Sequence, residues 1–139
     1  MGVSKPCVFC AIERGEADAC IVHRDEQVLA FLDRTPLFLG HVLVIPRAHI
    51  ATLPELPVDQ VGPLFQRVQL ITCAVQRAFD AAGTFVAMNN TISQSVPHLH
   101  VHVVPRNRGD GLRGFFWPRQ RYRDAAHMEE TAAALRAIL

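Results

Sequence analysis

Hydrophobic residues in this 139-residue chain occur in two kinds of pattern, short strand-like runs and longer helical stripes. Four short runs are rich in aliphatic and aromatic residues and end at charged residues, glycine or proline, which is typical of β-strands. The run from Val42 to Ile45 contains no polar residue, so we expect that strand to be buried on both faces. The four runs cover residues 20–22, 28–32, 42–45 and 85–88.

The longest apolar stripe lies in the middle of the chain and predicts an amphipathic helix. From Val61 to Phe79 apolar residues recur every three or four positions, the spacing that places them on one helical face. Pro63 suits the start of such a helix, and Gly83 suits its C-terminal cap. Two further helices are expected, over residues 7–17 and 125–139.

A fifth strand-like segment, between Pro97 and Pro105, alternates histidine with aliphatic residues. Because a strand sends successive side chains to opposite faces, we expect its three histidines on one face and its aliphatic residues on the other, in the core. Proline donates no hydrogen bond within a sheet, so the two prolines are expected to limit this strand. The histidines are His98, His100 and His102, and the aliphatic residues are Leu99, Val101 and Val103.

The order of these elements predicts the fold class. Three strands, a long helix and two more strands with short connections favour antiparallel pairing, with the long helix on one face of the sheet. The predicted class is therefore α+β. No internal repeat or linker is present, and the length suits a single domain over 1–139, in which about 105–139 form a C-terminal loop and helix.

Composition and charge narrow the functional classes. Half of the residues are hydrophobic and the formal net charge is +1, which argues against a disordered chain and gives no global indication of nucleic-acid binding. No stretch reaches the roughly 20 apolar residues of a membrane helix, and the first residues lack a secretory apolar run. We therefore expect a cytoplasmic protein with reduced cysteines and without nucleic-acid or membrane partners.

Positive charge is concentrated after the histidine segment, where six arginines are opposed only by Asp110. Such a run is as consistent with a solvated surface as with contacts to phosphate groups. Residues 109–114 also fit a GxGxxG pattern, but that pattern has meaning only where it opens a helix directly after a strand. Two phenylalanines, a tryptophan and a proline follow here, so we expect a mobile loop. The arginines are Arg106, Arg108, Arg113, Arg119, Arg121 and Arg123.

Three interpretations of the histidine segment are open from the residues alone. The histidines could simply be exposed to water on a polar strand face. They could bind zinc, although alternate residues on a straight strand lie roughly 6–7 Å apart, which leaves the outer two too far apart to share one ion. The third interpretation is nucleophilic catalysis, because a neutral imidazole can attack phosphorus covalently. His100, with a histidine on each side, is the expected nucleophile.

Cys7 and Cys10 form a CxxC pair, which is half of a zinc site. Without two further ligands the pair would be two small buried thiols. A redox motif would require a βαβ setting, which this sequence does not predict. Zinc accepts histidine beside cysteine, so histidines from elsewhere in the chain could complete the site.

Several segments together resemble the histidine triad (HIT) family of nucleotide hydrolases and transferases. Residues 98–104, His-Leu-His-Val-His-Val-Val, match the family's signature of three histidines alternating with apolar residues. The resemblance covers most of the chain. Four segments are similar to the family's opening helix, ribose-binding strand end, third strand and approach to the triad. In that order they are Cys7–Ile12, Leu29–Asp33, Gly40–His49 and Gln94–Val96.

The resemblance implies a HIT-like fold, with a five-stranded antiparallel meander sheet that dimerises into a ten-stranded sheet and one nucleotide site per subunit. In the family the middle histidine attacks the α-phosphorus of a nucleotide and expels the leaving group. Water or another acceptor then resolves the nucleotidyl-histidine. Carried over, His100 is the nucleophile, His102 contacts the phosphate and assists the leaving group, and the backbone of His98 orients the His100 ring. No metal or other cofactor is required for this chemistry.

The resemblance also implies nucleotide-binding residues. Asp33 matches the carboxylate that binds ribose hydroxyls, and Ser95 with an asparagine matches phosphate ligands. Asn89 is preferred to Asn90 as that asparagine, although the connection to the triad is shorter than the glycine-rich loop of many relatives, and an asparagine pair also suits a plain turn. His41 matches a further histidine that lines the site. The base pocket is matched by Phe9, Ile12 and Phe31.

A structural zinc ion is the cofactor that the resemblance implies. Some members of the family and their uridylyltransferase relatives hold zinc with such a cysteine pair. His98 would then be a ligand that also braces His100. The implied ligands are Cys7, Cys10, His49 and His98.

The sequence therefore predicts a HIT-family enzyme that cleaves at the α-phosphate of a purine nucleotide. The substrate is either an adenosine phosphoramidate or a dinucleoside polyphosphate, and the basic residues after the triad somewhat favour a charged leaving group. One alternative is a nucleotide-binding or scaffold protein with weak catalysis, against which the intact triad argues, because binding alone does not require His100. A metallohydrolase is the other alternative.

Overall fold

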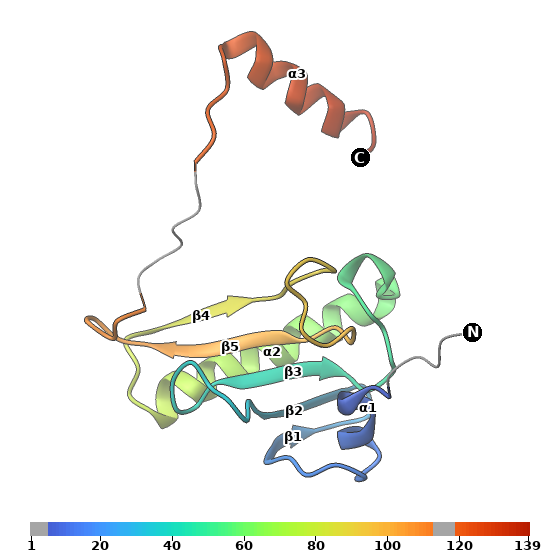
Figure 1. Cartoon of the computed structure of the whole chain (residues 1–139), viewed down its shortest axis with the longest axis vertical. Helices are drawn as coiled ribbons and strands as arrows, with labels where there is room; N and C mark the ends of the chain where they lie inside the picture. Colours follow the sequence, from blue (N-terminus) through green and yellow to red (C-terminus); the bar gives the residue numbers. More distant parts are fainter. Residues whose placement is uncertain (1–5, 113–118) are drawn as a thin grey trace.

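The computed structural model describes residues 6–112 and 119–139, and within these ranges five strands form one antiparallel sheet (Figure 1). The α+β prediction is confirmed. The strands are β1 (Ile21–Arg24), β2 (Val28–Leu32), β3 (Val42–Pro46), β4 (Gly83–Ala87) and β5 (Val101–Arg106). The helices are α1 (Val8–Glu13), α2 (Val58–Ala78) and α3 (Ala125–Arg136), with a short 3-10 turn, η1 (Leu53–Glu55).

The strand order in the sheet is β1-β2-β3-β5-β4, so the first three strands form the expected meander. The chain then passes through α2 to β4 at the far edge and returns as β5 between β3 and β4 (Figure 1). Every neighbouring pair is antiparallel. As a result β5, which carries the last triad histidine, is a central strand with a partner on each side.

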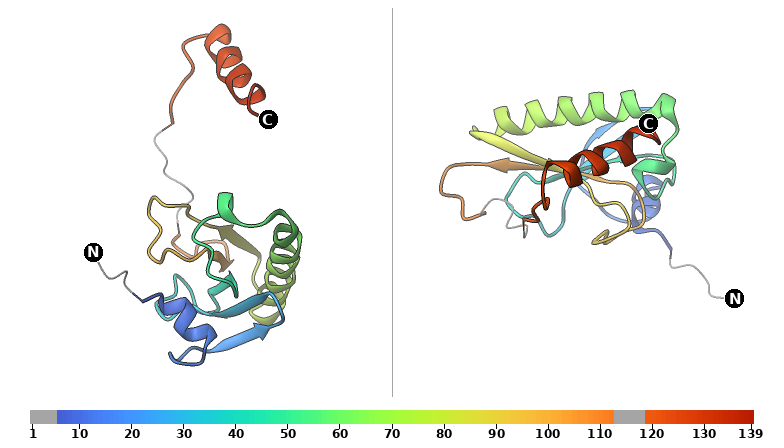
Figure 2. Two further views of the ribbon diagram at one scale, coloured as in Figure 1. Left: turned by 90° about the vertical axis from the view of Figure 1, so that its right-hand side faces the viewer. Right: turned by 90° about the horizontal axis from the view of Figure 1, so that it is seen from above.

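One face of the sheet is covered by α2, which lies along it in Figure 2. The helix buries a stripe at the predicted spacing and packs it against the aliphatic residues of the histidine segment, which are fully buried as expected. β3 is also buried throughout, which confirms the expectation for its uninterrupted apolar run. The stripe on α2 consists of Leu64, Val68, Ile71 and Val75.

The opposite face of the sheet carries α1 and a second, smaller apolar cluster. Phe9 and Ile12 of α1 pack there against alternate residues of β2 and β3. One of these, Leu43, lies opposite His102 in the β3–β5 register, so the His102 side chain is on the α1 face. The main core therefore lies on the α2 face, whereas the His102 side chain lies on the α1 face. The β2 and β3 residues of the cluster are Leu29, Phe31, Leu43 and Ile45.

The limits of the long helix differ from the prediction. α2 begins at Val58, so Pro63 lies inside it and removes one backbone hydrogen bond rather than starting the helix. The helix ends at Ala78, and Asp80 adopts the left-handed conformation (φ 47°) that was expected of Gly83. Gly83 is instead the first residue of β4.

The histidine segment is only partly a strand. Pro105 lies within β5, whereas Pro97–His100 precede it without sheet pairing. The backbone N–H of His98 donates to the carbonyl of Val96 (2.8 Å), and that of Leu99 donates to the carbonyl of Ile50 (2.7 Å). Because these hydrogen bonds go to loops, His98 lies before the part of the segment that pairs in the sheet, although its ring still contacts Phe9 of α1.

The two other helices, α1 and α3, are shorter than α2. α1 spans only Val8–Glu13, and the chain turns away at Gly15, which has φ 75°. No residue of α3 is buried against the rest of the described chain. In the described ranges none of the helices combines the length and apolar character needed to cross a membrane.

Candidate functional site

A cleft of about 650 Å³ opens on the α1 face of the sheet, beside the triad. This volume is in the range typical of sites for nucleotide-sized ligands. The cleft brings together aromatic and aliphatic side chains, a carboxylate, a hydroxyl and two imidazoles. The sequence-predicted residues that line it are Phe9, Ile12, Phe31, Asp33, Ser95, His100 and His102.

The His100 ring is buried at the floor of this cleft. Its Nδ1 lies 2.7 Å from the carbonyl oxygen of His98. A carbonyl can only accept, so Nδ1 carries a proton, and in the neutral ring the lone pair is on Nε2. Phe9 contacts the ring edge-on, with 5.1 Å between centroids, and restricts its tilt. The His98 backbone thus occupies the position expected of a group that orients the nucleophile.

His102 and His41 form a second pair of rings on the same side. Nε2 of His41 lies 2.9 Å from Nδ1 of His102, and the carboxylate of Asp33 lies 3.6 Å from the same His41 nitrogen. Burial lowers the pKa of His41. Burial also lowers the pKa of His102, to about 4, and the neighbouring His100 and His41 add to that effect. Both rings are therefore neutral at neutral pH.

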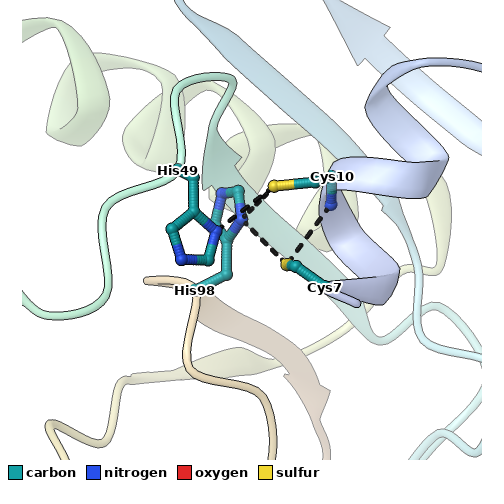
Figure 3. Close-up of side chains that lie close together, drawn as sticks. All are labelled: Cys7, Cys10, His49 and His98. Atoms are coloured by element: carbon teal, nitrogen blue, oxygen red, sulfur yellow. Dashed lines mark hydrogen bonds between the residues drawn. The ribbon is translucent and has the colours of Figure 1, made fainter. Parts of the chain in front are cut away.

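The His98 ring points away from the cleft toward the N-terminus of α1 (Figure 3). Its Nε2–H donates to the carbonyl of Pro46 at 2.8 Å, so Nδ1 holds the lone pair. That nitrogen faces the Sγ atoms of Cys7 at 3.4 Å and Cys10 at 3.6 Å. Burial, with His49 and His100 nearby, lowers the pKa of His98 although the Pro46 carbonyl opposes the shift. His98 therefore presents a neutral nitrogen ligand to the two thiols.

Two cysteines and two histidines come together at this point from three parts of the chain (Figure 3). Cys7 is the N-cap of α1, and its Sγ accepts the N–H of Cys10, which holds both thiols on the first turn. Cys10 Sγ lies 3.2 Å from Nδ1 of His49. The four ligand atoms all lie within 4.8 Å of one another. Cys₂His₂ is a common zinc ligand set, so the cluster could hold a metal ion.

In the absence of a metal ion, the environment of one thiol of this cluster, that of Cys10, disfavours a nucleophilic role. Burial raises the pKa of the Cys10 thiol, and the neighbouring Cys7 thiol raises it further. A bound cation would reverse that preference, because thiolate is the form that coordinates metal. The structure brings all four expected ligands together.

The loop before the triad separates the two candidate asparagines. Asn90 Oδ1 accepts the N–H of Leu53 at 2.8 Å and so braces this loop against η1. Asn89 is exposed, and its amide donates to the carbonyl of Ser93 at 3.1 Å within the same loop. Neither asparagine is among the residues that line the cleft, whereas Ser95 is.

Several features of the site were missed by sequence reasoning. Arg47 donates to Glu13 at 2.8 Å and so fastens α1, with its cysteines, to the end of β3. The two residues are 34 positions apart in the sequence, and no pattern in the sequence indicated their contact. Cys20, which has no distinctive sequence pattern, lines the cleft and is exposed. Leu43 also lines the cleft, and its alternation along β3 could have indicated this face.

Among the described arginines that follow the triad, Arg106 is already paired, whereas the others are exposed. Arg106 is held by Asp110 at 2.6 Å and by the carbonyl of Leu112 at 2.6 Å. Arg108, Arg119, Arg121 and Arg123 are exposed, and Arg113 lies outside the described residues. The mobile loop expected over the glycine-rich pattern extends into 113–118, which also lie outside them. Its described part is a turn around Asp110, not the start of a helix.

Comparison with known proteins identifies the class to which this fold and site belong. The HIT domain family model matches residues 14–109, and the chain belongs to this family. The predicted resemblance is therefore confirmed. HIT domain proteins are nucleotide-binding hydrolases and transferases.

The chain is also similar to individual proteins and solved structures of this family. It is 37% identical over 108 residues to the adenylylsulfatase HINT3 of Arabidopsis thaliana, with 76% of this chain and 55% of that protein covered. It is 30% identical over 92 residues to the asymmetrical bis(5'-nucleosyl)-tetraphosphatase of Schizosaccharomyces pombe, covering 65% and 50%. A HIT family structure from Bacillus subtilis matches with TM-score 0.90 at 30% identity, covering 97% and 98%. A zinc-bound histidine triad protein from Mycobacterium smegmatis matches with TM-score 0.74 at 34% identity, covering 99% and 100%.

Proposed function

We propose that the protein is a nucleotidyl hydrolase or transferase that works through a covalent nucleotidyl-histidine. The observation that carries the proposal is the His100 ring, whose proton is held on Nδ1 by the His98 carbonyl at 2.7 Å. Its Nε2 lone pair is thereby free for attack on phosphorus. The Nε2–P bond forms as the bond from phosphorus to the leaving group breaks, and the leaving group takes the electron pair. Water then attacks the same phosphorus, the Nε2–P bond breaks with its electron pair returning to Nε2, and the nucleoside monophosphate is released. The proton that water gives up balances the proton that an amine leaving group takes from solvent.

The substrate that fits the cleft is a purine nucleotide with a substituent on its α-phosphate. Phe9, Ile12 and Phe31 form an apolar wall suited to a base, and Asp33 is placed for the ribose hydroxyls. Ser95 and the His102 ring are suited to the phosphate, with His41 behind them. Asn89 is favoured over Asn90 as a further phosphate ligand, because Asn90 already braces the loop through its side-chain oxygen.

Two classes of leaving group are candidates, an amine and a nucleotide. The named relatives are an adenylylsulfatase and a bis(5'-nucleosyl)-tetraphosphatase, and these two names do not decide between the classes. Arg106 is held by Asp110, so it lends no support to a charged leaving group. An adenosine phosphoramidate and a dinucleoside polyphosphate are therefore both substrates to be tested.

We also propose a structural zinc ion held by Cys7, Cys10, His49 and His98. The support is the donor set, the lone pair that His98 aims at the thiols, and the zinc-bound relative. When bound, the ion would supply stability and stiffness rather than Lewis-acid chemistry at the phosphate. The catalytic groups do not include it.

A homodimer is the proposed assembly, and the β4 edge is its proposed site. β4 is the last strand of the sheet on that side. Its sequence, Gly-Thr-Phe-Val-Ala, lacks the charges and prolines that usually protect an exposed edge, and Val86 is 41% exposed. Pairing of two such edges would give the ten-stranded sheet that the resemblance implies. The cytoplasmic location stays a prediction.

Intact-protein mass spectrometry tests the function directly. Wild type and His100→Gln are mixed briefly with adenosine phosphoramidate and, separately, with diadenosine tetraphosphate. We expect a nucleotidyl adduct in wild type only, formed faster with one substrate, which identifies the leaving-group class. His100→Gln should retain affinity for AMP. If wild type forms no adduct and turns over neither substrate, the protein binds nucleotide without this chemistry. Turnover that stops at once on chelation would indicate a metallohydrolase instead.

A further inference from the structure

The loop between β4 and the triad, residues 89–96 (the pre-triad loop), is hydrogen-bonded to residues 50–53 (the supporting segment), which lead from β3 toward α2 (Figure 1). The side-chain oxygen of Asn90 accepts the N–H of Leu53 at 2.8 Å. This hydrogen bond attaches the beginning of the loop to the end of the supporting segment.

The side chain of Gln94 makes a second attachment and uses both ends of its amide. Its Oε1 accepts the N–H of Thr91 at 2.9 Å, and its Nε2 donates to the carbonyl of Ala51 at 2.6 Å. A backbone N–H can only donate and a carbonyl can only accept, so these two partners determine the orientation of the amide. Gln94 therefore joins the two ends of the pre-triad loop to each other and to the supporting segment.

The backbone of the pre-triad loop requires such attachments. Thr91 has φ 69° and Ser93 has φ 59°, which places both residues in the left-handed region. Residues other than glycine rarely adopt that conformation, and a β-branched threonine is especially unfavourable there. Such residues keep it only where the surrounding structure fixes them. Gln94 binds the N–H of one of these residues and directly follows the other.

The shape of this loop decides where Ser95 lies. Ser95 directly follows Gln94 and lines the cleft. The supporting segment also fixes the backbone just before His100, because the carbonyl of Ile50 accepts the N–H of Leu99 at 2.7 Å. One short stretch of backbone therefore sets the position of the Ser95 hydroxyl relative to the His100 ring.

We propose that Gln94 is a positioning residue that holds the Ser95 hydroxyl at the phosphate end of the nucleotide cleft. This role rests on the proposed function and specifies how its phosphate site is built. Gln94 directs its amide at the supporting segment, and no bond to it forms or breaks during the reaction. The apolar wall for the base and Asp33 belong to other parts of the chain. Gln94 should consequently affect the binding of phosphate and not the binding of base or ribose.

Isothermal titration with AMP and with adenosine separates the phosphate contacts from the base and ribose contacts. Methionine is nearly as long as glutamine but cannot make this pair of hydrogen bonds. We expect Gln94→Met to lower the affinity for AMP about tenfold, the usual effect of losing a hydrogen bond to a charged group, and to change the affinity for adenosine less than about twofold. Gln69→Met, at an exposed position of α2, is the matched control and should change neither. Equal losses for both ligands would overturn the proposal.

A double-mutant cycle tests whether Gln94 acts through Ser95. Ser95→Ala alone should lower the affinity for AMP about tenfold. In the Ser95→Ala background, Gln94→Met should then lower it by less than about threefold, because the group that it positions is already gone. Losses that multiply to about 100-fold would show that Gln94 acts independently of Ser95, and the proposal would fail.

Amide hydrogen exchange tests the hydrogen bonds in the wild type without a ligand. We expect the Thr91 amide to exchange at least about tenfold more slowly than in an unfolded chain, although Thr91 is exposed. Gln94→Met should remove this protection, whereas the Leu53 amide, which Asn90 accepts, should keep its own. A Thr91 amide without protection in the wild type would overturn the proposal, and this result does not depend on whether a variant folds.

Failure of the proposed function is distinguishable from failure of the role of Gln94. Equal affinities of the wild type for AMP and adenosine would contradict both. A preference of the wild type for AMP that is unchanged in Gln94→Met would contradict the role of Gln94 alone. If Gln94→Met does not fold, Gln94→Asn, whose shorter amide cannot reach both partners, replaces it in the titrations and should show the same selective loss for AMP.

Discussion

The carbonyl oxygen of His98 lies 2.7 Å from Nδ1 of His100, so the backbone of one triad histidine holds the ring of the next. The side chain of the same residue points the other way, with Nδ1 3.4 Å from Cys7 Sγ. His98 therefore connects the Cys₂His₂ cluster to the His100 ring. Whatever fixes the His98 ring also fixes the carbonyl that sets the His100 tautomer.

Loss of metal should weaken the fold more than the chemistry. We expect about one zinc per chain in purified protein, measured by native mass spectrometry. Cys10→Ser or chelation should remove it and lower the melting temperature by about 10 °C. Adduct formation at His100 should slow but not stop. Cys73→Ser, which changes an exposed cysteine outside the cluster, is the control and should keep its metal. Unchanged zinc content in Cys10→Ser would contradict the ligand assignment.

Asp33→Asn should abolish discrimination between ribose and deoxyribose. Asp33 Oδ1 accepts the N–H of Thr35 at 2.9 Å, which orients the carboxylate at the edge of the cleft. Charged hydrogen bonds to the ribose hydroxyls would contribute about 1.5–3 kcal/mol, so KM for a ribonucleotide should rise about 10- to 100-fold. KM for the 2',3'-dideoxy analogue should change little. Equal rises for both substrates would show that Asp33 acts elsewhere.

Acid should destabilise the protein partly through His102. Burial lowers the pKa of its folded form to about 4, whereas the unfolded chain has the usual value of about 6.5. Between these values the unfolded state binds more protons, so stability is complete above about pH 6.5 and falls as the pH drops toward 4. Urea denaturation across this window should show a shallower loss in His102→Gln. Both proteins should be compared in the same metal-bound state, and parallel curves would contradict the shift.

Gly40→Ala should be strongly destabilising. Gly40, next to His41, has φ +98°, and an added Cβ would lie 2.4 Å from the Phe79 ring. We expect a loss of about 2–4 kcal/mol by denaturant unfolding, from backbone strain and from this overlap. In a Phe79→Ala background the same change should cost about 1–2 kcal/mol, because only the strain remains. Gly62→Ala in α2 meets nothing within 4 Å and should stabilise slightly. Equal costs in both backgrounds would exclude the overlap.

Local patterns predicted most of the elements, because they depend on spacing along the chain. The stripe from Val61 to Phe79 identified α2, and alternation placed Leu99, Val101 and Val103 in the core. Element limits were less predictable. Asp80 ends α2 where Gly83 was expected, since a single residue with positive φ is sufficient and aspartate tolerates it. Pro105 likewise does not limit the strand, because it lies within β5 and pairs with Thr84 of β4.

The candidate site, like the fold, could be predicted from the sequence only in part. Residue types and their spacing, together with a family resemblance, indicated the triad, the CxxC pair and a nucleotide as ligand. They could not indicate that three alternating histidines point to different partners: His98 to the thiols, His100 to the cleft and His102 to His41. The backbone of His98 lies before β5, and its hydrogen bonds go to loops. The rings of His98 and His100 both contact Phe9 of α1, yet each of the three histidines meets a different group.

The sequence by itself determined the fold class, the core positions and the residues able to do the chemistry, because these follow from hydrophobic periodicity and residue type. Only the tertiary structure decided which nitrogen of each histidine carries the proton. That choice depends on a carbonyl or an amide brought close by folding, such as the Leu37 N–H at His41, and on the burial that keeps the His41 ring neutral. Neither contact is encoded in the local pattern of the chain, because each one is made when separate segments pack together.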